Sequence, residues 1–151
     1  MNNKLVIDSC VFAKIFLEEE ESHIAKSLYI NACKENKIIM ASTIFEYEIL
    51  AIIRRYNLPF DVLYPIIAEQ LKTSINVIHL DQEITRKAYQ ISKTGNEKSG
   101  FPSFYDSTYH ALAILNECDF ITSDKKHYEK TKHLGNIKLL KNETAKQQFR
   151  K

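Results

Sequence analysis

The sequence predicts an α/β domain of three layers, with helices on both faces of a central, mainly parallel sheet. Short apolar runs typical of buried strands alternate with longer stretches whose apolar residues recur at helical spacing. This alternation favours parallel strands, because a crossover between parallel strands needs a connection of helical length. The 151 residues fit one domain, and three glycines and three prolines leave little material for linkers.

The first part of the chain supplies two predicted strands. The first is Leu5–Ile7, and Asp8 follows it directly, before a helix expected over Val11–Leu17. Ser22 is the expected N-cap of a second helix, since apolar residues recur behind it with a helical period. The second strand is predicted at Ile38–Met40.

The helix after the second strand has the clearest pattern. Thr43 and Glu46 match a T-x-x-E capping box, in which each side chain binds a backbone N–H of the first turn. Asn57 and Pro59 end this helix, and Asp61 is the expected cap of the next one. The residues expected on the buried face are Phe45, Ile49, Ile52 and Tyr56.

The second part of the chain continues the alternation around one plain loop at residues 95–103. Asp81 is the expected cap of a helix that stops at Gly95. The other expected elements are strands at Ile75–Leu80, Phe120–Thr122 and Ile137–Leu140, a helix over Phe104–Asn116, and a short basic helix between the last two strands. Residues 1–141 are therefore predicted to form the domain, and residues 142–151 a basic tail.

Four acidic residues fall where parallel strands end. Asp8 and Asp124 follow strands directly, Glu48 lies early in the helix after the second strand, and Asp106 lies in the first turn of its helix. Ligands of open α/β sheets bind at this edge. Clustered carboxylates repel one another unless a cation compensates them, and Mg²⁺ prefers such oxygen ligands. The pattern predicts a site for a divalent metal that binds a phosphate.

Each acid also has a structural alternative. Asp8 and Asp124 are placed to cap the helices that follow them, and Asp106 stands three residues after Ser103 in an S-x-x-D capping pattern. Glu48 lies within or beside the apolar face of its helix, where an unpaired carboxylate is costly. It therefore needs either a metal or an ion pair, for which Arg55 is the candidate.

The segments around these acids resemble the motifs of PIN-domain ribonucleases, especially the VapC-type toxins of toxin–antitoxin pairs. They occur in the family's order and approximate spacing, as VIDSCVFAKIFLEEEES, ASTIFEYEILAIIRR, FYDSTYHALA and FITSD. The resemblance implies a three-layer PIN fold, Mg²⁺- or Mn²⁺-dependent cleavage of single-stranded RNA, homodimers, and inhibition by a cognate antitoxin. It also implies that the metal-binding catalytic residues are Asp8, Glu48, Asp106 and Asp124.

Some details of the resemblance concern neighbouring residues. Thr122 is expected to orient Asp124 by hydrogen bonding. Relatives often carry Ser or Asn where this chain has Cys10, so Ser9 is the alternative supporting group. Some relatives place a further acid after the last motif, where this chain has lysines, so four acids is the largest set expected.

Several other residues are expected to pack in the core. His110 is one, and the aromatic side chains around Asp106 are others, although base stacking is their alternative role. These aromatic residues are Phe101, Phe104, Tyr105 and Tyr109. The three cysteines form no C-x-x-C pair and are expected as small buried side chains in a reducing cytoplasm; they are Cys10, Cys33 and Cys118.

The charge distribution and the sequence motifs limit the functions that this chain is expected to have. Residues 121–151 carry a net charge of +6 and the first 120 residues −4, which suits a phosphate-bearing partner or else a solvated terminus. There is no signal-peptide core or membrane-length apolar run, so a cytoplasmic protein is expected. No dinucleotide, P-loop or H-E-x-x-H motif occurs. The alternatives to a nuclease are a catalytically silent PIN scaffold and a receiver-like phospho-acceptor domain.

Overall fold

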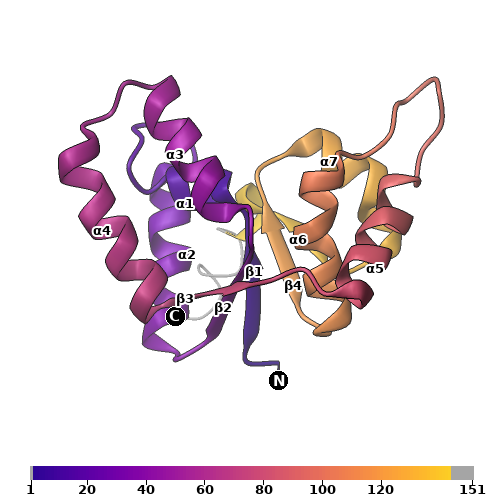
Figure 1. The fold of residues 1–151 in the computed structure, drawn as a ribbon, viewed down its shortest axis with the longest axis horizontal. Coiled ribbons are helices and arrows are strands. Elements are labelled where there is room, and N and C mark those ends of the chain that lie inside the picture. The colour runs from indigo at the N-terminus through magenta and orange to yellow at the C-terminus, as the bar shows by residue number, and fades with distance from the viewer. Residues whose placement is uncertain (1, 144–151) are drawn as a thin grey trace.

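A five-stranded sheet with only parallel strand pairs forms the centre of the computed structural model, which describes residues 2–143. The strand order β3-β2-β1-β4-β5 puts the first strand in the middle (Figure 1). The strands are β1 (Lys4–Ile7), β2 (Ile38–Ser42), β3 (Ile75–Ile78), β4 (Asp119–Thr122) and β5 (Ile137–Leu139). The predicted parallel sheet is confirmed.

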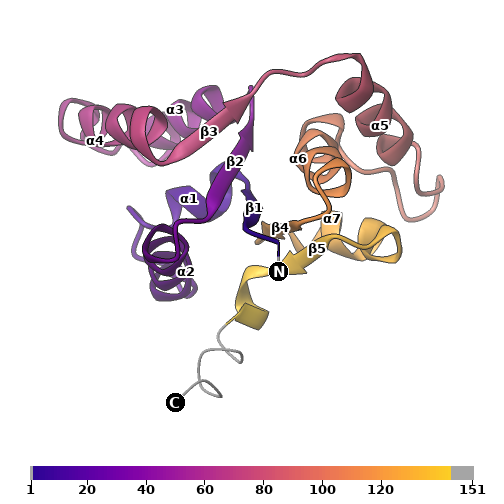
Figure 2. The same ribbon diagram turned by 90° about the horizontal axis from the view of Figure 1, so that it is seen from below.

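Helices cover both faces of this sheet, which confirms the three-layer prediction. Figure 2 shows α5 and α6 on one side of the central strands and α1 and α2 on the other. The helices are α1 (Ser9–Ala13), α2 (Ser22–Lys34), α3 (Phe45–Arg55), α4 (Phe60–Thr73), α5 (Gln82–Ser92), α6 (Phe104–Leu115) and α7 (Lys125–Thr131). Most of the tail expected at residues 142–151 lies outside the described residues, which end at 143.

The helix caps test several local predictions. Asp81 caps α5 as expected, since its Oδ1 accepts a hydrogen bond from the backbone N–H of Ile84 at 2.8 Å. Ser22 does not cap α2: its hydroxyl donates to the carbonyl of Leu17 at 2.5 Å and so closes the preceding turn. The first helix is also shorter than expected, because α1 ends at Ala13.

The capping box predicted at the start of α3 is wrong. Strand β2 extends to Ser42, which is paired with Ile78 of β3, so the helix begins only at Phe45. The Thr43 hydroxyl lies 3.3 Å from Nδ1 of His79 instead of binding the helix. The predicted cap of α4 is also wrong, because Asp61 lies inside the first turn and makes no capping bond.

The buried face of α3 is partly as predicted. Phe45 and Ile49 are buried, but Ile53 completes the buried face, while Ile52 is only half-buried and Tyr56 is 48% exposed. The helix does end where expected, because Asn57 adopts a left-handed backbone conformation with φ 49°.

Helix α6 is the most deeply buried helix segment. Every residue from 107 to 113 is buried, because one side of α6 packs on the central strands and the other side on α5. His110 is fully buried, as expected, with Nε2 2.7 Å from the carbonyl oxygen of Gly135.

The cysteines were expected to be buried, and only Cys118 is. Cys10 and Cys33 are exposed, so the prediction was wrong for two of the three. Among residues 2–143 no helix is long and apolar enough to cross a membrane.

Candidate active site

Asp8 lies at the carboxyl end of the central strand and uses both of its carboxylate oxygens. Oδ1 accepts a hydrogen bond from the backbone N–H of Val11 at 2.8 Å and caps α1. Oδ2 accepts one from the hydroxyl of Thr122 at 2.7 Å. The side chain is 3% exposed. The capping alternative therefore describes one oxygen correctly, and the second oxygen ties β1 to the end of β4.

Thr122 joins two of the four acids. Besides donating to Asp8, its hydroxyl accepts the backbone N–H of Asp124 at 3.0 Å. The carboxylate of Asp124 is held from the other side, since Oδ1 accepts the backbone N–H of His127 at 3.0 Å and caps α7. Thr122 thus positions Asp124 through its backbone, whereas its direct side-chain contact is with Asp8.

Glu48 points towards α6. Its Oε1 accepts a hydrogen bond of 2.6 Å from the hydroxyl of Tyr109, which is fully buried. Glu46, two residues earlier, faces α4 instead and accepts a hydrogen bond of 3.3 Å from Tyr64. Within the described chain Glu48 forms no ion pair with Arg55, which is exposed. Of the two glutamates, Glu48 is therefore the one that faces the other acids.

Asp106 completes the group from the first turn of α6. Ser103 caps this helix by itself, because its hydroxyl accepts the backbone N–H of Tyr105 at 3.1 Å. The S-x-x-D capping alternative does not apply, and the carboxylate of Asp106 has no hydrogen-bond partner in the described part of the chain. It is the acid with the fewest restraints on its orientation.

The carboxylates influence one another's ionisation. Burial raises the pKa of Asp8 to about 7 in spite of its two hydrogen bonds, and the charges of Asp106 and Glu48 add to the rise. Burial also raises the pKa of Asp106 to about 6, with contributions from Asp124 and Glu48. The pKa of Glu48 is raised by burial, while hydrogen bonds from Tyr109 and Ser9 oppose the rise. A cation nearby would favour the ionised form of all three.

The donor set suits a divalent cation with oxygen ligands. All four groups are carboxylates, and three of them carry a destabilising charge in its absence. In the described residues, no three His, Cys, Asp or Glu side chains are close enough to enclose a metal ion by themselves. Mg²⁺ in proteins is commonly held by one or two carboxylates, with retained waters in the remaining positions.

Two further side chains, Ser9 and Tyr109, act on Glu48. Ser9 is buried and helps to lower the pKa of Glu48, whereas Cys10 is exposed, which favours the serine as the supporting group. Tyr109 was expected to pack in the core or, alternatively, to stack on a base, yet its hydroxyl donates a hydrogen bond to Glu48. Its position three residues after Asp106, on the same face of α6, was the available signal.

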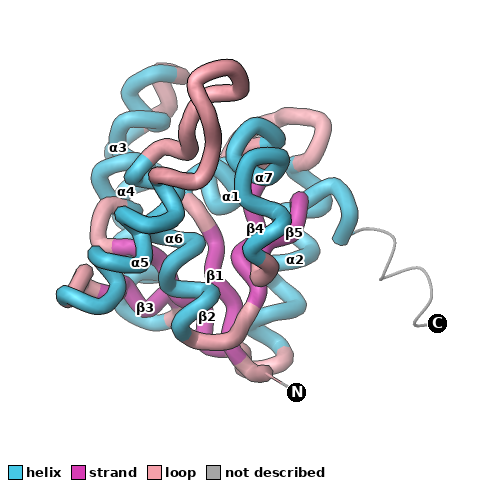
Figure 3. The backbone as a smooth tube through the Cα atoms, turned by 90° about the vertical axis from the view of Figure 1, so that its right-hand side faces the viewer, coloured by secondary structure: helices cyan, strands magenta, loops and turns pink. Residues whose placement is uncertain are grey.

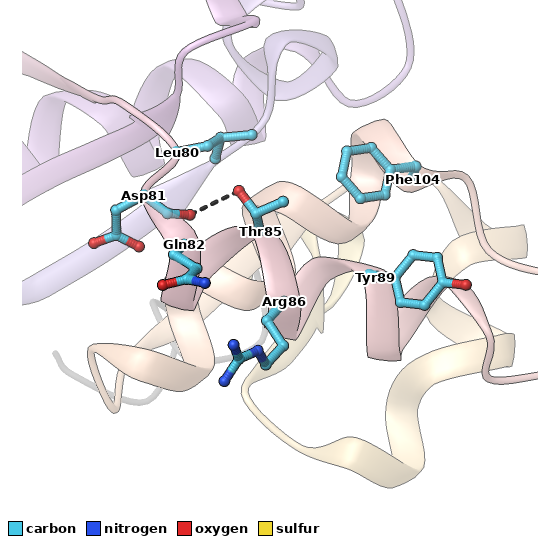
Figure 4. Close-up of a pocket in the computed structure, with 7 residues that line it drawn as sticks. All are labelled: Leu80, Asp81, Gln82, Thr85, Arg86, Tyr89 and Phe104. Atoms are coloured by element: carbon cyan, nitrogen blue, oxygen red, sulfur yellow. Dashed lines mark hydrogen bonds between the residues drawn. The ribbon is translucent and has the colours of Figure 1, made fainter.

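The remaining aromatic residues around Asp106 were wrongly expected in the core. Their exposed fractions are 50% for Phe101, 38% for Phe104 and 64% for Tyr105. Phe104 lines a hollow of about 560 Å³ along α5 (Figure 4). The other lining residues are Leu80, Asp81, Gln82, Thr85, Arg86 and Tyr89. This hollow contains none of the four acids, and its one carboxylate already caps α5.

Comparisons with known proteins agree with this fold. A family model described as PIN domain matches residues 5–133. A toxin–antitoxin complex from Klebsiella pneumoniae is similar in structure, with a TM-score of 0.62, 14% identity, and coverage of 90% of this chain and 97% of that chain. No curated protein sequence matches this chain.

Two further solved structures are similar. VapC20 of Mycobacterium tuberculosis, a Sarcin-Ricin loop cleaving toxin, has a TM-score of 0.64 and 17% identity over 83% of this chain and 93% of that chain. VapBC2 from Rickettsia felis, bound to a DNA fragment from its promoter, has a TM-score of 0.59 and 14% identity over 90% of this chain and 96% of that chain.

Proposed function

The chain belongs to the PIN-domain family, and on that basis we propose that it is a metal-dependent endoribonuclease that acts as the toxin of a toxin–antitoxin pair. The observation that carries the proposal is the group of four acids at the carboxyl ends of β1, β2 and β4, with the pKa of both Asp8 and Asp106 raised. The similar structures include a toxin–antitoxin complex and a Sarcin-Ricin loop cleaving toxin, which supports the same assignment.

In this proposal the residues Asp8, Glu48, Asp106 and Asp124 hold Mg²⁺ or Mn²⁺. A bound ion of this kind supplies charge stabilisation at a phosphate and a water of lowered pKa. Asp8 and Glu48 are kept in place by the hydroxyls of Thr122 and Tyr109. Asp106 has no hydrogen-bond partner among residues 2–143, which leaves it able to turn towards the ion or the attacking water. Hydrolysis then adds water across one P–O bond of the RNA.

The proposal includes the partners that the resemblance implies: a cognate antitoxin, a second copy of the chain, and RNA in the cytoplasm. A receiver-like phospho-acceptor is less well supported. Such modules have the strand order 2-1-3-4-5, whereas the order here is β3-β2-β1-β4-β5.

The test is cleavage of single-stranded RNA by the purified protein with Mg²⁺, with Mn²⁺ and with EDTA. We expect cleavage with either ion and none with EDTA. Asp106→Asn should abolish cleavage, while the matched variant Asp61→Asn, an exposed acid in the first turn of α4, should keep it. Failure to cleave any RNA with metal present would favour the silent scaffold.

A further inference from the structure

A second hollow, of about 870 Å³, lies between α7 and the loop that joins α5 to α6. We propose that it binds a backbone phosphate of the RNA strand beyond the bond that is cut, an inference that rests on the proposed function. Figure 3 shows the loop standing beside α7. The lining residues are Thr94, Gly95, Asn96, Ser99, Lys125, Lys126, Glu129, Lys130 and His133.

The charge of this hollow is positive and largely unmatched. Lys125 and Lys126 are exposed, and neither has an ion-pair partner in the part of the chain that is described. The one acid of the hollow, Glu129, is already paired with Lys132 at 2.5 Å, which lies outside the lining. The ammonium groups of Lys125 and Lys126, beside a carboxylate that already has a cationic partner, favour binding of an anion. Lysine binds phosphate as a point charge.

The loop wall of the hollow is held in a defined shape. Asn96 accepts hydrogen bonds from the backbone N–H groups of Lys98 and Ser99 at 3.0 and 2.9 Å. Gly95 allows the two sides of the loop to approach, since a Cβ there would lie 2.4 Å from the carbonyl oxygen of Gly100. Lys130 ties the loop to α7 through a 3.1 Å hydrogen bond to the Phe101 carbonyl. The hollow is therefore formed before any ligand arrives.

Each wall of the hollow is followed or preceded along the chain by one of the acids. Lys125 directly follows Asp124, and the loop leads into α6, whose first turn carries Asp106. A strand with one phosphate at the acids can place a neighbouring phosphate at the lysines. The lining contains no large apolar side chain of the kind that anchors a protein partner, which favours nucleic acid over peptide.

The test compares two double variants with equal loss of charge. Lys125→Gln/Lys126→Gln alters the hollow, and Lys26→Gln/Lys34→Gln alters exposed lysines on α2, on the opposite face of the sheet. Binding of a labelled single-stranded RNA is measured by fluorescence anisotropy in EDTA, where no cleavage is needed. We expect the first pair to raise Kd roughly tenfold and to lower the slope of log Kd against log salt by about 0.7, the value for one lost phosphate contact on a single strand.

The control pair should leave both quantities nearly unchanged. Equal losses in the two pairs would mean that only net charge matters, and an unchanged Kd in the first pair would exclude the hollow as a phosphate subsite. Either outcome overturns the proposal. Since the assay needs no cleavage, an inactive protein whose RNA binding still depends on Lys125 and Lys126 would refute the nuclease proposal alone.

Discussion

Replacing Asp106 by asparagine should stabilise the metal-free protein at neutral pH. The carboxylate is half-buried beside Asp124 and Glu48, and these surroundings raise its pKa from 3.8 to about 6. In the unfolded chain it ionises near its ordinary pKa, so between about pH 4 and 6 the folded state holds more protons than the unfolded state. The free energy of unfolding therefore falls as pH rises through this window, and stays lower above it.

The size of the effect follows from the shift. About two pKa units correspond to about 3 kcal/mol at most, because one unit is worth about 1.4 kcal/mol. Partial exposure and salt reduce this figure. Asparagine also loses the favourable interaction of a negative charge with the N-terminus of α6, worth about 0.3–1 kcal/mol. We expect a net gain of about 1–2 kcal/mol at pH 7.5 and almost none at pH 4.

The measurement is urea unfolding of wild type and variant at both pH values, in EDTA and then with saturating Mg²⁺. Because a ligand that binds only the folded state stabilises it, Mg²⁺ should reverse the order and make the wild type the more stable protein. Asp61→Asn serves as control and should lose a few tenths of a kcal/mol at pH 7.5. A variant less stable than wild type in EDTA, or an order that Mg²⁺ leaves unchanged, would refute the electrostatic reasoning.

Three further predictions concern single side chains. Glu48→Gln should reduce cleavage at least about 100-fold, whereas Glu46→Gln should keep most activity because it faces α4; similar losses in a kinetic assay would contradict the difference in orientation. Thr122→Val should lower the free energy of unfolding by about 1–3 kcal/mol, because it leaves one oxygen of the buried Asp8 without its hydrogen-bond donor. A urea unfolding midpoint equal to that of the wild type would contradict this prediction. Gly95→Ala should displace the loop and weaken RNA binding, and unchanged anisotropy curves would argue against a preformed wall.

The strands and the positions of the four acids were predictable because they depend on local pattern. An apolar run followed by an acid identifies the end of a buried strand, as at Asp8 and Asp124, without knowledge of the partner strands. The parallel arrangement followed from the long connections. Whether the acids bind metal remains a prediction, which the cleavage and stability measurements above test.

The errors arose where long-range contacts decide the local structure. The T-x-x-E pattern at Thr43 is a correct match of letters, but pairing of Ser42 with β3 extends the strand and delays the helix. The bond from Tyr109 to Glu48 joins residues 61 positions apart and has no local signature beyond a shared helix face. Exposure of Phe104 and Tyr105 likewise depends on the neighbours of α6, which the sequence pattern alone does not specify.

The central position of β1 has a consequence for how the protein is made. One edge of β1 pairs with β2. The other edge pairs with β4, which is synthesised more than a hundred residues later, and so remains unpaired until then. A nascent chain that has emerged only through α5 therefore lacks two of the four acids and has an open strand edge. Such a chain cannot contain a complete acid group, so a nuclease built in this order stays inactive towards RNA until β4 and Asp124 have been synthesised.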